Sequence, residues 1–488
     1  MSYTRKVAYN TAVQIVGRVL GVGISVVTAA AIFRYLGIEG VGKYTTAFAF
    51  VSFFAVFADF GLGWTLLREL ATSKDQNKAF QNIFTLRLLL AIAVHLISLI
   101  ILIFFSYAFD VKMAIIVVTA AWFFQTMNST IVAVFLNNYR LDISVAAEVL
   151  GKIVILGAIL YLSKIGVSFV VLMSAFLMGN FVNFAINLIF ANKFVKVGFA
   201  FDKEYLKKVI YIAVPIGVVI VFSFVYYKID SIMLSLMKGM VDVGIYGTAY
   251  KILEVLQTFP VLFLGAAFPL ITKYATQKDE RVVPAFQKQF DFLALLALPI
   301  VVSIYLLASP IIALIAGSRG AEFISTATVT WFNTPLTSVT CLKILIFSVG
   351  LSFITSLYSY MIISLGKQRV MIWPTIGFAA FNLALNFLLI PKYSYFGAAF
   401  ATLFTEIVVL LTSYYYANSF IRLPIDLKAF FRALLAAVLM GGAIYFLSQI
   451  GVNLLVNLAI SFILYALLAI LFKAVPMELI RAVIGREQ

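Results

Sequence analysis

Four positively charged side chains lie inside long apolar stretches of the sequence, where a charge is costly. They are Arg18, Arg87, Lys251 and Lys343. A charged side chain at the centre of a bilayer costs at least about 2.5 kcal/mol, so such residues normally face a bundle interior or a hydrated cavity. Guanidinium and ammonium groups there can hold an anionic substrate. Arg87 and Lys343 lie nearer the ends of their stretches, so an alternative is that they snorkel to the membrane surface.

Polar and small residues follow one face of the stretch that contains Arg18. They are Asn10, Gln14, Arg18, Gly21, Ser25 and Thr28. Their spacing of three or four residues places all of them on one side of a helix, with apolar residues on the others. We expect Asn10, Gln14 and Arg18 to line a polar space and bind substrate. For Gly21, Ser25 and Thr28, close helix packing is an equal alternative.

Three acidic residues in apolar stretches are candidates for coupling transport to an ion. They are Asp59, Glu254 and Glu406. Lys251 and Glu254 are one helical turn apart, so an ion pair within the helix is an alternative to substrate binding by Lys251. The amides Asn180, Asn183, Asn187, Asn382 and Asn386, and the single histidine His95, are expected to make hydrogen bonds that hold helices together.

Signatures of catalysis and of cofactors are missing from the sequence. There is one cysteine, Cys341, and one histidine, which excludes an intramolecular disulfide and a histidine-based metal site. No glycine-rich phosphate loop ends in Gly-Lys-Ser/Thr, so ATP hydrolysis on this chain is not expected. We therefore predict a protein that is not an enzyme, with no catalytic residue, cofactor or metal.

The composition indicates which kind of secondary structure carries these charged and polar residues. Hydrophobic residues make up 64% of the 488 residues, charged residues make up 11%, and the mean hydropathy is +1.08. This composition indicates an all-α polytopic membrane protein. At about 20 apolar residues per crossing, the sequence predicts fourteen spans, near residues 10–33, 44–67, 83–107, 113–136, 147–163, 167–191, 207–236, 245–272, 292–316, 338–364, 371–390, 396–418, 432–449 and 453–472. The loop at 317–335 is expected to contain a short interfacial helix.

The distribution of lysine and arginine predicts the orientation. With the N-terminus inside, 24 of these residues fall on the inner side and eight on the outer side. Cytoplasmic loops carry an excess of Lys and Arg, so both termini are expected in the cytoplasm and the protein in the cell membrane. The net charge of +16 then indicates affinity for anionic membrane lipids. It does not indicate nucleic-acid binding, because the cations are spread over many short loops.

A repeated segment indicates two related halves. Residues 37–69 align with residues 239–271 at an offset of 202, which pairs Gly42 with Gly244 and Tyr44 with Tyr246. Internal repeats of apolar helices are typical of transporters built from two moving halves. We predict an N-terminal lobe at 1–200, a C-terminal lobe at 201–420 and two additional spans at 421–488. Asp59 has no acidic counterpart in the second copy, where Val261 takes its place.

Several motifs resemble one transporter family. Gly37, Gly40, Gly42 and Tyr44, then Asp59-Phe60-Gly61-Leu62 and Arg68-Glu69, are similar to the start of the polysaccharide-repeat flippases of the multidrug/oligosaccharidyl-lipid/polysaccharide exporter superfamily. Leu342-Lys343-Ile344-Leu345, Leu389-Ile390-Pro391-Lys392 and Gly397-Ala398-Ala399 resemble later parts of that family. The likeness covers essentially the whole chain.

The resemblance implies two six-helix lobes in a V, with two further C-terminal helices. It also implies a flippase that moves polyprenyl-diphosphate-linked oligosaccharides from the inner to the outer leaflet. The acidic residues in apolar stretches and the missing phosphate loop predict that transport is coupled to H⁺ or Na⁺. A glycan polymerase or ligase is then a candidate protein partner. A peptidoglycan-precursor flippase and a multidrug cation/proton antiporter of the same superfamily are the alternatives. A membrane glycosyltransferase would need a carboxylate pair for a metal or a large soluble loop, and the sequence has neither.

Overall fold

The computed structural model describes residues 3–475, with the side chains of residues 9, 10 and 12–475. Contacts between residues divide the chain into two compact units. Unit 1 consists of residues 1–247 and 375–391, and unit 2 consists of residues 248–374 and 392–488. The division into lobes at residues 200 and 420 remains a prediction.

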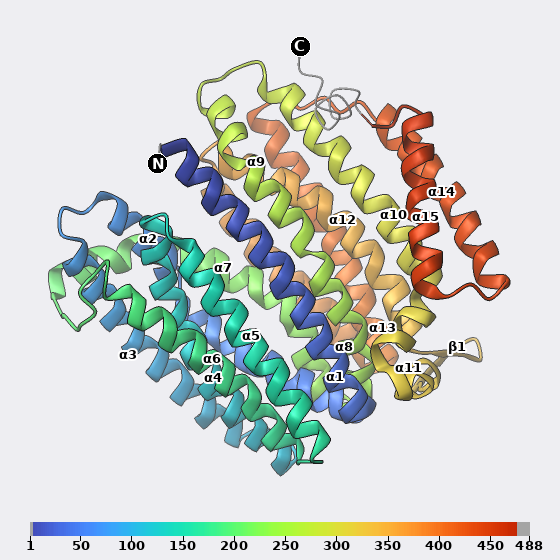
Figure 1. Ribbon diagram of the computed structural model, residues 1–488, viewed down its shortest axis with the longest axis horizontal. Helices are drawn as coiled ribbons and strands as arrows, with labels where there is room; N and C mark the ends of the chain where they lie inside the picture. Colours follow the sequence, from blue (N-terminus) through green and yellow to red (C-terminus); the bar gives the residue numbers. More distant parts are fainter. Residues whose placement is uncertain (1–2, 476–488) are drawn as a thin grey trace. The chain divides into compact units, whose positions relative to one another are not determined.

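Helices dominate both units (Figure 1). Within residues 3–475, twelve helical segments are long and apolar enough to cross a membrane, which confirms the predicted class of all-α polytopic membrane protein. These segments are Ala12–Thr72, Gln76–Ile103, Phe109–Asn137, Leu141–Lys164, Phe169–Ala191, Lys203–Met237, Met240–Thr276, Val282–Ser325, Ser338–Ser364, Gln368–Phe420, Lys428–Gln449 and Leu454–Leu471.

Unit 1 is a bundle in which α4 packs on α6, α6 on α5, and α5 on α1. Its complete helices are α1 (Tyr3–Asp59), α2 (Leu62–Thr72), α3 (Gln76–Ile103), α4 (Phe109–Asn137), α5 (Leu141–Lys164), α6 (Phe169–Ala191) and α7 (Lys203–Met237). The unit also includes the first residues of α8 (Met240–Leu256) and part of α13 (Ile372–Phe420). Its apolar core joins the end of α1 to α2, α3, α4 and α7.

Unit 2 contains the remaining helices and one small hairpin. Its elements are the rest of α8 and α13, with α9 (Thr258–Thr276), α10 (Val282–Ala316), η1 (Gly317–Arg319), α11 (Gly320–Ser325), β1 (Val329–Trp331), β2 (Thr334–Leu336), α12 (Ser338–Ser364), η2 (Gln368–Met371), α14 (Lys428–Gln449) and α15 (Leu454–Leu471). Small residues on α14 allow it to pack closely on α10. The Tyr465 hydroxyl of α15 donates a hydrogen bond to the Leu295 carbonyl at 2.9 Å.

The loop at 317–335 contains the short helix that the sequence predicts, which is α11. It also contains a two-stranded antiparallel hairpin, β1–β2, which was not predicted. Phe332 and Asn333 form its turn with positive φ values of 46° and 62°, as two-residue hairpins commonly require. The single cysteine, Cys341, follows the hairpin at the start of α12 and is fully buried.

Non-helical residues interrupt the longest helices. Gly37 has φ 69° within α1, and Ser394 has φ 49° within α13. A further break separates α1 from α2, because Phe60 and Gly61 both have positive φ values. The predicted span at 44–67 is therefore wrong in one respect, since it is interrupted at these two residues and is not one continuous helix.

The two copies of the repeat touch within unit 1 through a reciprocal glycine contact. A Cβ atom on Gly42 would overlap the backbone carbonyl of Met240, and one on Gly244 would overlap the carbonyl of Ile38. Met240 lies 202 residues after Ile38, and Gly244 lies 202 residues after Gly42. The two contacts are therefore equivalent, because each one joins a glycine of one copy to the residue that lies four positions before the corresponding glycine in the other copy. Only glycine allows two backbones to come this close.

Candidate functional site

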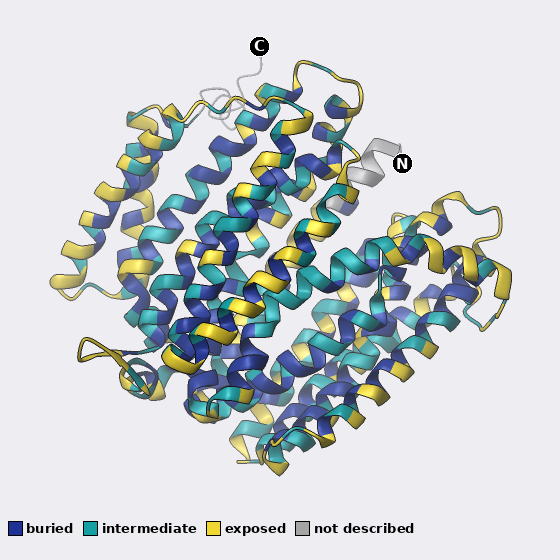
Figure 2. Cartoon of the chain, turned by 180° about the vertical axis from the view of Figure 1, so that it is seen from behind, coloured by how far each residue is buried: buried dark blue, intermediate teal, exposed yellow. Residues whose placement is uncertain are grey.

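The polar face of α1 lies along the edge of its contact with α5. Asn10 is 5% exposed, and its side chain binds the Tyr139 carbonyl at 2.7 Å and the Leu141 amide at 3.0 Å, so it holds α1 against the turn before α5. Gln14 and Arg18 are exposed. At about 100° per residue, Arg18 lies about 80° around the helix from Asn10. On the predicted face, Asn10 is therefore buried in a contact between helices, whereas Gln14 and Arg18 are exposed. The helix that carries them, α1, starts near the N label in Figure 2.

Lys152 of α5 supplies a second cation beside this face. A Cβ atom on Gly21 would lie 2.6 Å from the Lys152 ammonium nitrogen. Gly21 is one turn from Arg18 on the same side of α1, where residues three apart are neighbours. Glu148 forms an ion pair with Lys152 at 2.8 Å, and both side chains are partly exposed. We call Gln14, Arg18 and Lys152 the cationic face.

The other hydroxyl groups of the predicted stripe bind within α1. Ser25 donates to the Gly21 carbonyl at 2.7 Å, and Thr28 donates to the Ile24 carbonyl at 2.8 Å. Hydroxyl groups that bond back to their own helix are already satisfied. Both hydroxyl groups are therefore satisfied within α1, and the exposed polar groups of the stripe are Gln14 and Arg18.

A buried ion pair joins α1 to α3. Arg87 of α3 donates through Nη2 to the Asp59 carboxylate at the end of α1, and to the Ser129 hydroxyl of α4 at 2.7 Å. The Arg87 side chain is 3% exposed and that of Asp59 is 27% exposed. Arg87 therefore does not snorkel, and its charge is compensated where α1 ends before the break at Phe60 and Gly61. Nε and Nη1 of Arg87 make no hydrogen bond with the described residues.

Unit 2 holds the remaining predicted site residues. Lys251 and Glu254 form the expected ion pair within α8 at 3.0 Å. The Lys343 ammonium lies 5.2 Å from the centre of the Tyr305 ring, a distance at which a cation is attracted to the face of an aromatic ring. Glu406 is 5% exposed and contacts the Thr355 hydroxyl. Among the ion pairs of the described residues, none includes Glu406.

The predicted hydrogen bonds between helices are confirmed for two asparagines of α6. Asn187 donates to the Asn128 side chain of α4 at 2.8 Å, and Asn180 donates to the Ala121 carbonyl at 3.1 Å. The His95 ring contacts the Ala91 carbonyl at 2.7 Å, within its own helix. In α13, Asn386 donates to the Asn382 side chain at 2.9 Å. The hydrogen bonds of Asn183, Asn386 and His95 among the described residues lie within their own helices, so for these three the prediction of bonds between helices is wrong.

Three polar residues near these sites escaped the sequence interpretation. Lys152 lies five residues inside the predicted span at 147–163, but it is not among the four charged side chains selected from the sequence. Asp230 is the single acidic residue of the span at 207–236. It is 1% exposed and accepts a hydrogen bond from the Tyr246 hydroxyl. Ser129 gives no signal in the sequence, because its role depends on Arg87 reaching it from another helix.

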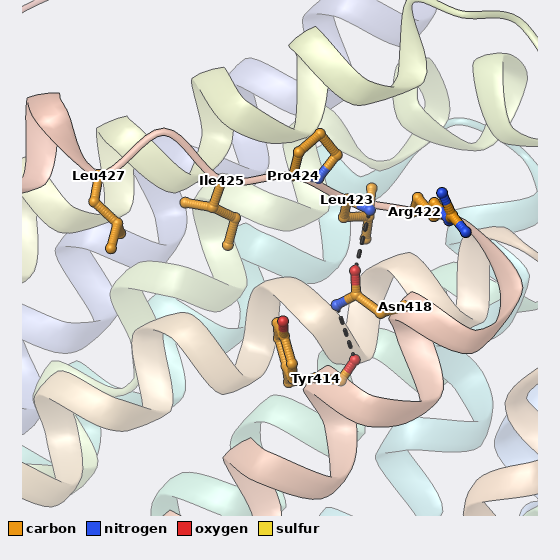
Figure 3. A pocket seen from close by; sticks show the side chains of 7 residues that line it. All are labelled: Tyr414, Asn418, Arg422, Leu423, Pro424, Ile425 and Leu427. Carbon is orange, nitrogen blue, oxygen red and sulfur yellow. Dashed lines mark hydrogen bonds between the residues drawn. The ribbon is translucent and has the colours of Figure 1, made fainter.

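A cavity of about 540 Å³ lies in unit 2 between the end of α13 and the segment that leads to α14 (Figure 3). Tyr414, Asn418 and Arg422 supply its polar lining, and the other lining residues are apolar. Asn418 stabilises this turn by binding the Tyr414 carbonyl and the Leu423 amide at 3.0 and 3.1 Å. No group of three or more His, Cys, Asp or Glu residues that could hold a metal occurs among residues 3–475.

A family model described as polysaccharide biosynthesis protein matches residues 4–275. None of the curated proteins matches the sequence. Among solved structures, lipid II flippase MurJ in an inward closed conformation has a TM-score of 0.76 and 14% identity, covering 98% of this chain and 100% of that chain. An inward-facing multidrug resistance MATE family transporter of the MOP superfamily has a TM-score of 0.65 and 14% identity, covering 83% and 95%. A MOP superfamily transporter from Pyrococcus furiosus has a TM-score of 0.60 and 14% identity, covering 84% and 96%.

Proposed function

Because the chain belongs to the family described as polysaccharide biosynthesis proteins, we propose that it is a flippase that moves polyprenyl-diphosphate-linked oligosaccharide units across the membrane. The proposed direction is from the cytoplasmic to the outer leaflet, by alternating access. The fold supports a transporter of the MOP superfamily, since it is shared with MurJ and MATE transporters.

The proposal rests on the cationic face. Arg18 and Lys152 come from two different helices of unit 1, and the Lys152 ammonium lies beside Gly21, three residues after Arg18 on α1. A guanidinium can hold two phosphate oxygens in a bidentate fork, and an ammonium adds a point charge beside it. This arrangement suits a diphosphate. The Gln14 amide on the same face can donate to and accept from sugar hydroxyls.

A lipid II flippase is the second candidate, favoured by the match to MurJ over the full length of both chains. Its cargo also contains a diphosphate, so the cationic face does not separate the two functions. Transport assays with each cargo would separate them. A multidrug cation antiporter is disfavoured, because a cationic substrate would be repelled by Arg18, although the charge of Lys152 is paired with Glu148.

The finer fold is part of the proposal: fourteen crossings arranged as two six-helix lobes with two more helices. The segments Ala12–Thr72 and Gln368–Phe420 contain 61 and 53 residues. At 1.5 Å per residue they are about 90 and 80 Å long, against about 30 Å of hydrocarbon in a bilayer. The breaks at Gly37 and Ser394 support two crossings in each segment.

Coupling to an ion gradient is also proposed, with Glu406 as the strongest of the three acidic candidates. Asp59 and Glu254 each pair with a cation, whereas Glu406 is buried beside a hydroxyl group. We expect cargo movement by the purified protein in vesicles to slow when proton and sodium gradients are collapsed. The Glu406→Gln variant should be slow and insensitive to that collapse. Full wild-type transport without either gradient would contradict coupling.

The test of the proposed function is complementation in a flippase-deficient strain whose surface glycan is restored by the wild-type chain. Arg18→Ala should lower surface glycan by about tenfold or more, because a charge-assisted hydrogen bond contributes about 1.5 to 3 kcal/mol. Arg18→Lys should retain part of the activity, and Arg18→Glu should have none. Lys152→Ala should also lower the activity.

The matched control is Lys164→Ala, which removes an exposed cation from the far end of the same helix and should leave glycan unchanged. The amount of each variant in the membrane is measured in parallel. If Arg18→Ala and Arg18→Glu both support wild-type glycan, the cationic face does not bind cargo. The site must then be sought at Arg87, Lys251 and Lys343.

A further inference from the structure

We propose that residues 193–211, which include most of the connection between α6 and α7 and the first residues of α7, form a binding surface for anionic phospholipids of the bilayer. We call this segment the junction strip. The proposal does not depend on the cargo, so it can fail while the proposed transport function stands. It assigns lipid binding to one site on the protein.

Positive charge is concentrated on the junction strip. It has five exposed lysines, which are Lys193, Lys196, Lys203, Lys207 and Lys208. Its two acidic residues are Asp202 and Glu204. Lys78 of α3 pairs with Asp202 at 2.6 Å and lowers the pKa of that carboxyl, so the Asp202 charge is already compensated from outside the strip. Clustered lysines next to membrane helices attract anionic lipid headgroups.

Large aromatic side chains are exposed beside these lysines. Phe199 is 70% exposed, Phe201 is 66% exposed and Tyr211 is 83% exposed. A Tyr ring at the end of a membrane helix prefers the headgroup region of the bilayer, and the two Phe rings add exposed apolar surface that acyl chains can cover. α6 ends at Ala191 and α7 begins at Lys203, so the strip lies where the chain leaves one apolar helix and enters the next. Lysines and aromatic rings at this position fit a charged lipid surface.

The first turns of α3 hold the backbone of the strip in place. Asn77 accepts a hydrogen bond from the Lys196 amide at 2.7 Å, and Thr85 accepts one from the Ala200 amide at 3.1 Å. Asn82 accepts another from the Asp202 amide at 2.6 Å. The side chains of α3 bind the backbone amides of the strip. The lysine and phenylalanine side chains of the strip are not used in these hydrogen bonds and remain exposed. Binding a lipid then requires little ordering of the chain.

A groove of about 530 Å³ lies along the contact between the strip and α3. Lys78, Lys196 and Phe201 are among its lining residues, together with the amides of Asn77 and Gln81. Asp75 and Asp202 also line the groove, and Asp202 is paired with Lys78. The Lys196 ammonium and the Asn77 amide are therefore its donors for an anion, next to the exposed Phe201 ring. A phosphate headgroup can bind the donors while its acyl chains remain in the bilayer beside the ring.

The experiment places a fluorescent reporter in the strip. The full-length Phe199→Trp variant is reconstituted in vesicles of phosphatidylcholine that contain equal fractions of brominated phosphatidylglycerol or brominated phosphatidylcholine. Bromine quenches a tryptophan that it contacts, and the signal of the four native tryptophans is subtracted with the wild-type protein. We expect quenching by the anionic lipid to exceed that by phosphatidylcholine by about twofold or more.

Two controls define the outcome. In Phe332→Trp, which reports on an 89% exposed position of the β1–β2 hairpin, the two lipids should quench equally. Replacing Lys193, Lys196, Lys207 and Lys208 by Gln should abolish the preference at position 199, and Phe201→Trp provides a second reporter if Phe199→Trp does not fold. Equal quenching by both lipids, no quenching, or a preference that survives loss of the lysines would overturn the proposal.

Discussion

Asp59 combines two properties that bear on its candidate role in ion coupling. Its carboxylate is at the last residue of α1, and it binds the buried guanidinium of Arg87. Removing one partner of a buried pair leaves an uncompensated charge, which is much more costly than losing the pair as a whole. An ion that binds at Asp59 would have to displace Arg87. We infer that the pair stabilises the contact between α1 and α3.

The first residue-scale prediction concerns this pair. Asp59→Asn should destabilise the protein by about 3 kcal/mol, the lower end of the range for a broken buried pair, because Asp59 is 27% exposed. The double variant Asp59→Asn with Arg87→Gln should regain most of that stability, since it leaves no unpaired charge. The measurement is the Tm of the purified protein in detergent. Equal losses in the single and double variants would mean that the charges are not coupled.

At the residue scale, the sequence identified the unusual charged side chains but not all of their partners, and the role of these side chains in binding remains a prediction. Arg18, Arg87, Lys251 and Lys343 stand out because charge is rare in apolar stretches. The pair of Lys251 with Glu254 was foreseeable, because both residues are on one helix. The pair of Arg87 with Asp59 was not, because an apolar helix gives no sign of which neighbour each face meets. Lys152 was missed for the same reason.

At the scale of elements, the main feature is the crossing of α1 and α8 at Gly42 and Gly244. Each glycine lies against a backbone carbonyl of the other helix. The repeat in the sequence predicted that these glycines correspond to each other, but not that they touch. A sequence repeat shows that two segments are similar, but it does not show how far apart they lie in the folded protein. The contact itself depends on how the two helices pack.

The prediction at this scale is that Gly42→Ala and Gly244→Ala each lower the Tm. An added methyl group must push the two backbones apart, and such overpacking costs about 1 to 3 kcal/mol or more. Gly23→Ala is the matched control on α1, because no atom lies within 4 Å of a Cβ built there. It should be neutral or slightly stabilising, since Ala favours a helix by up to about 1 kcal/mol over Gly.

Unchanged thermal stability of both Gly42→Ala and Gly244→Ala would show that the crossing is looser than the structure indicates. A loss in Gly23→Ala of the same size would show that α1 is sensitive to any substitution. Either result would remove the glycine contact as the explanation.

At the scale of the whole molecule, the length of apolar runs explains most of the successful predictions. The predicted spans at 167–191 and 453–472 agree within two residues with α6 and α15. Apolar length is a strong signal, because a helix must match the thickness of the bilayer. The breaks at Gly37 and Ser394 fall between predicted spans. The break at Phe60 and Gly61 was not predicted, because hydropathy does not report local backbone conformation.

The orientation of the chain is the prediction that concerns the whole molecule. Lys203→Cys and Arg281→Cys should react with a membrane-impermeant maleimide only after cells are permeabilised, whereas Arg319→Cys should react in intact cells. The charge bias places the first two positions inside and the third outside. All three side chains are exposed, and the wild-type protein is a suitable control, because its single cysteine is buried. Labelling of positions 203 and 319 from the same side would contradict the fourteen-span topology.

The glycine crossing has a consequence for how evolution can be used to find contacts in such proteins. A side chain at Gly42 or Gly244 would collide with backbone atoms, and no substitution at another position removes a backbone carbonyl. Neither glycine can therefore be rescued by a compensating mutation, and purifying selection should hold both fixed. Methods that detect contacts from correlated substitutions need positions that vary. They will be blind to this pair, one of the closest approaches in unit 1.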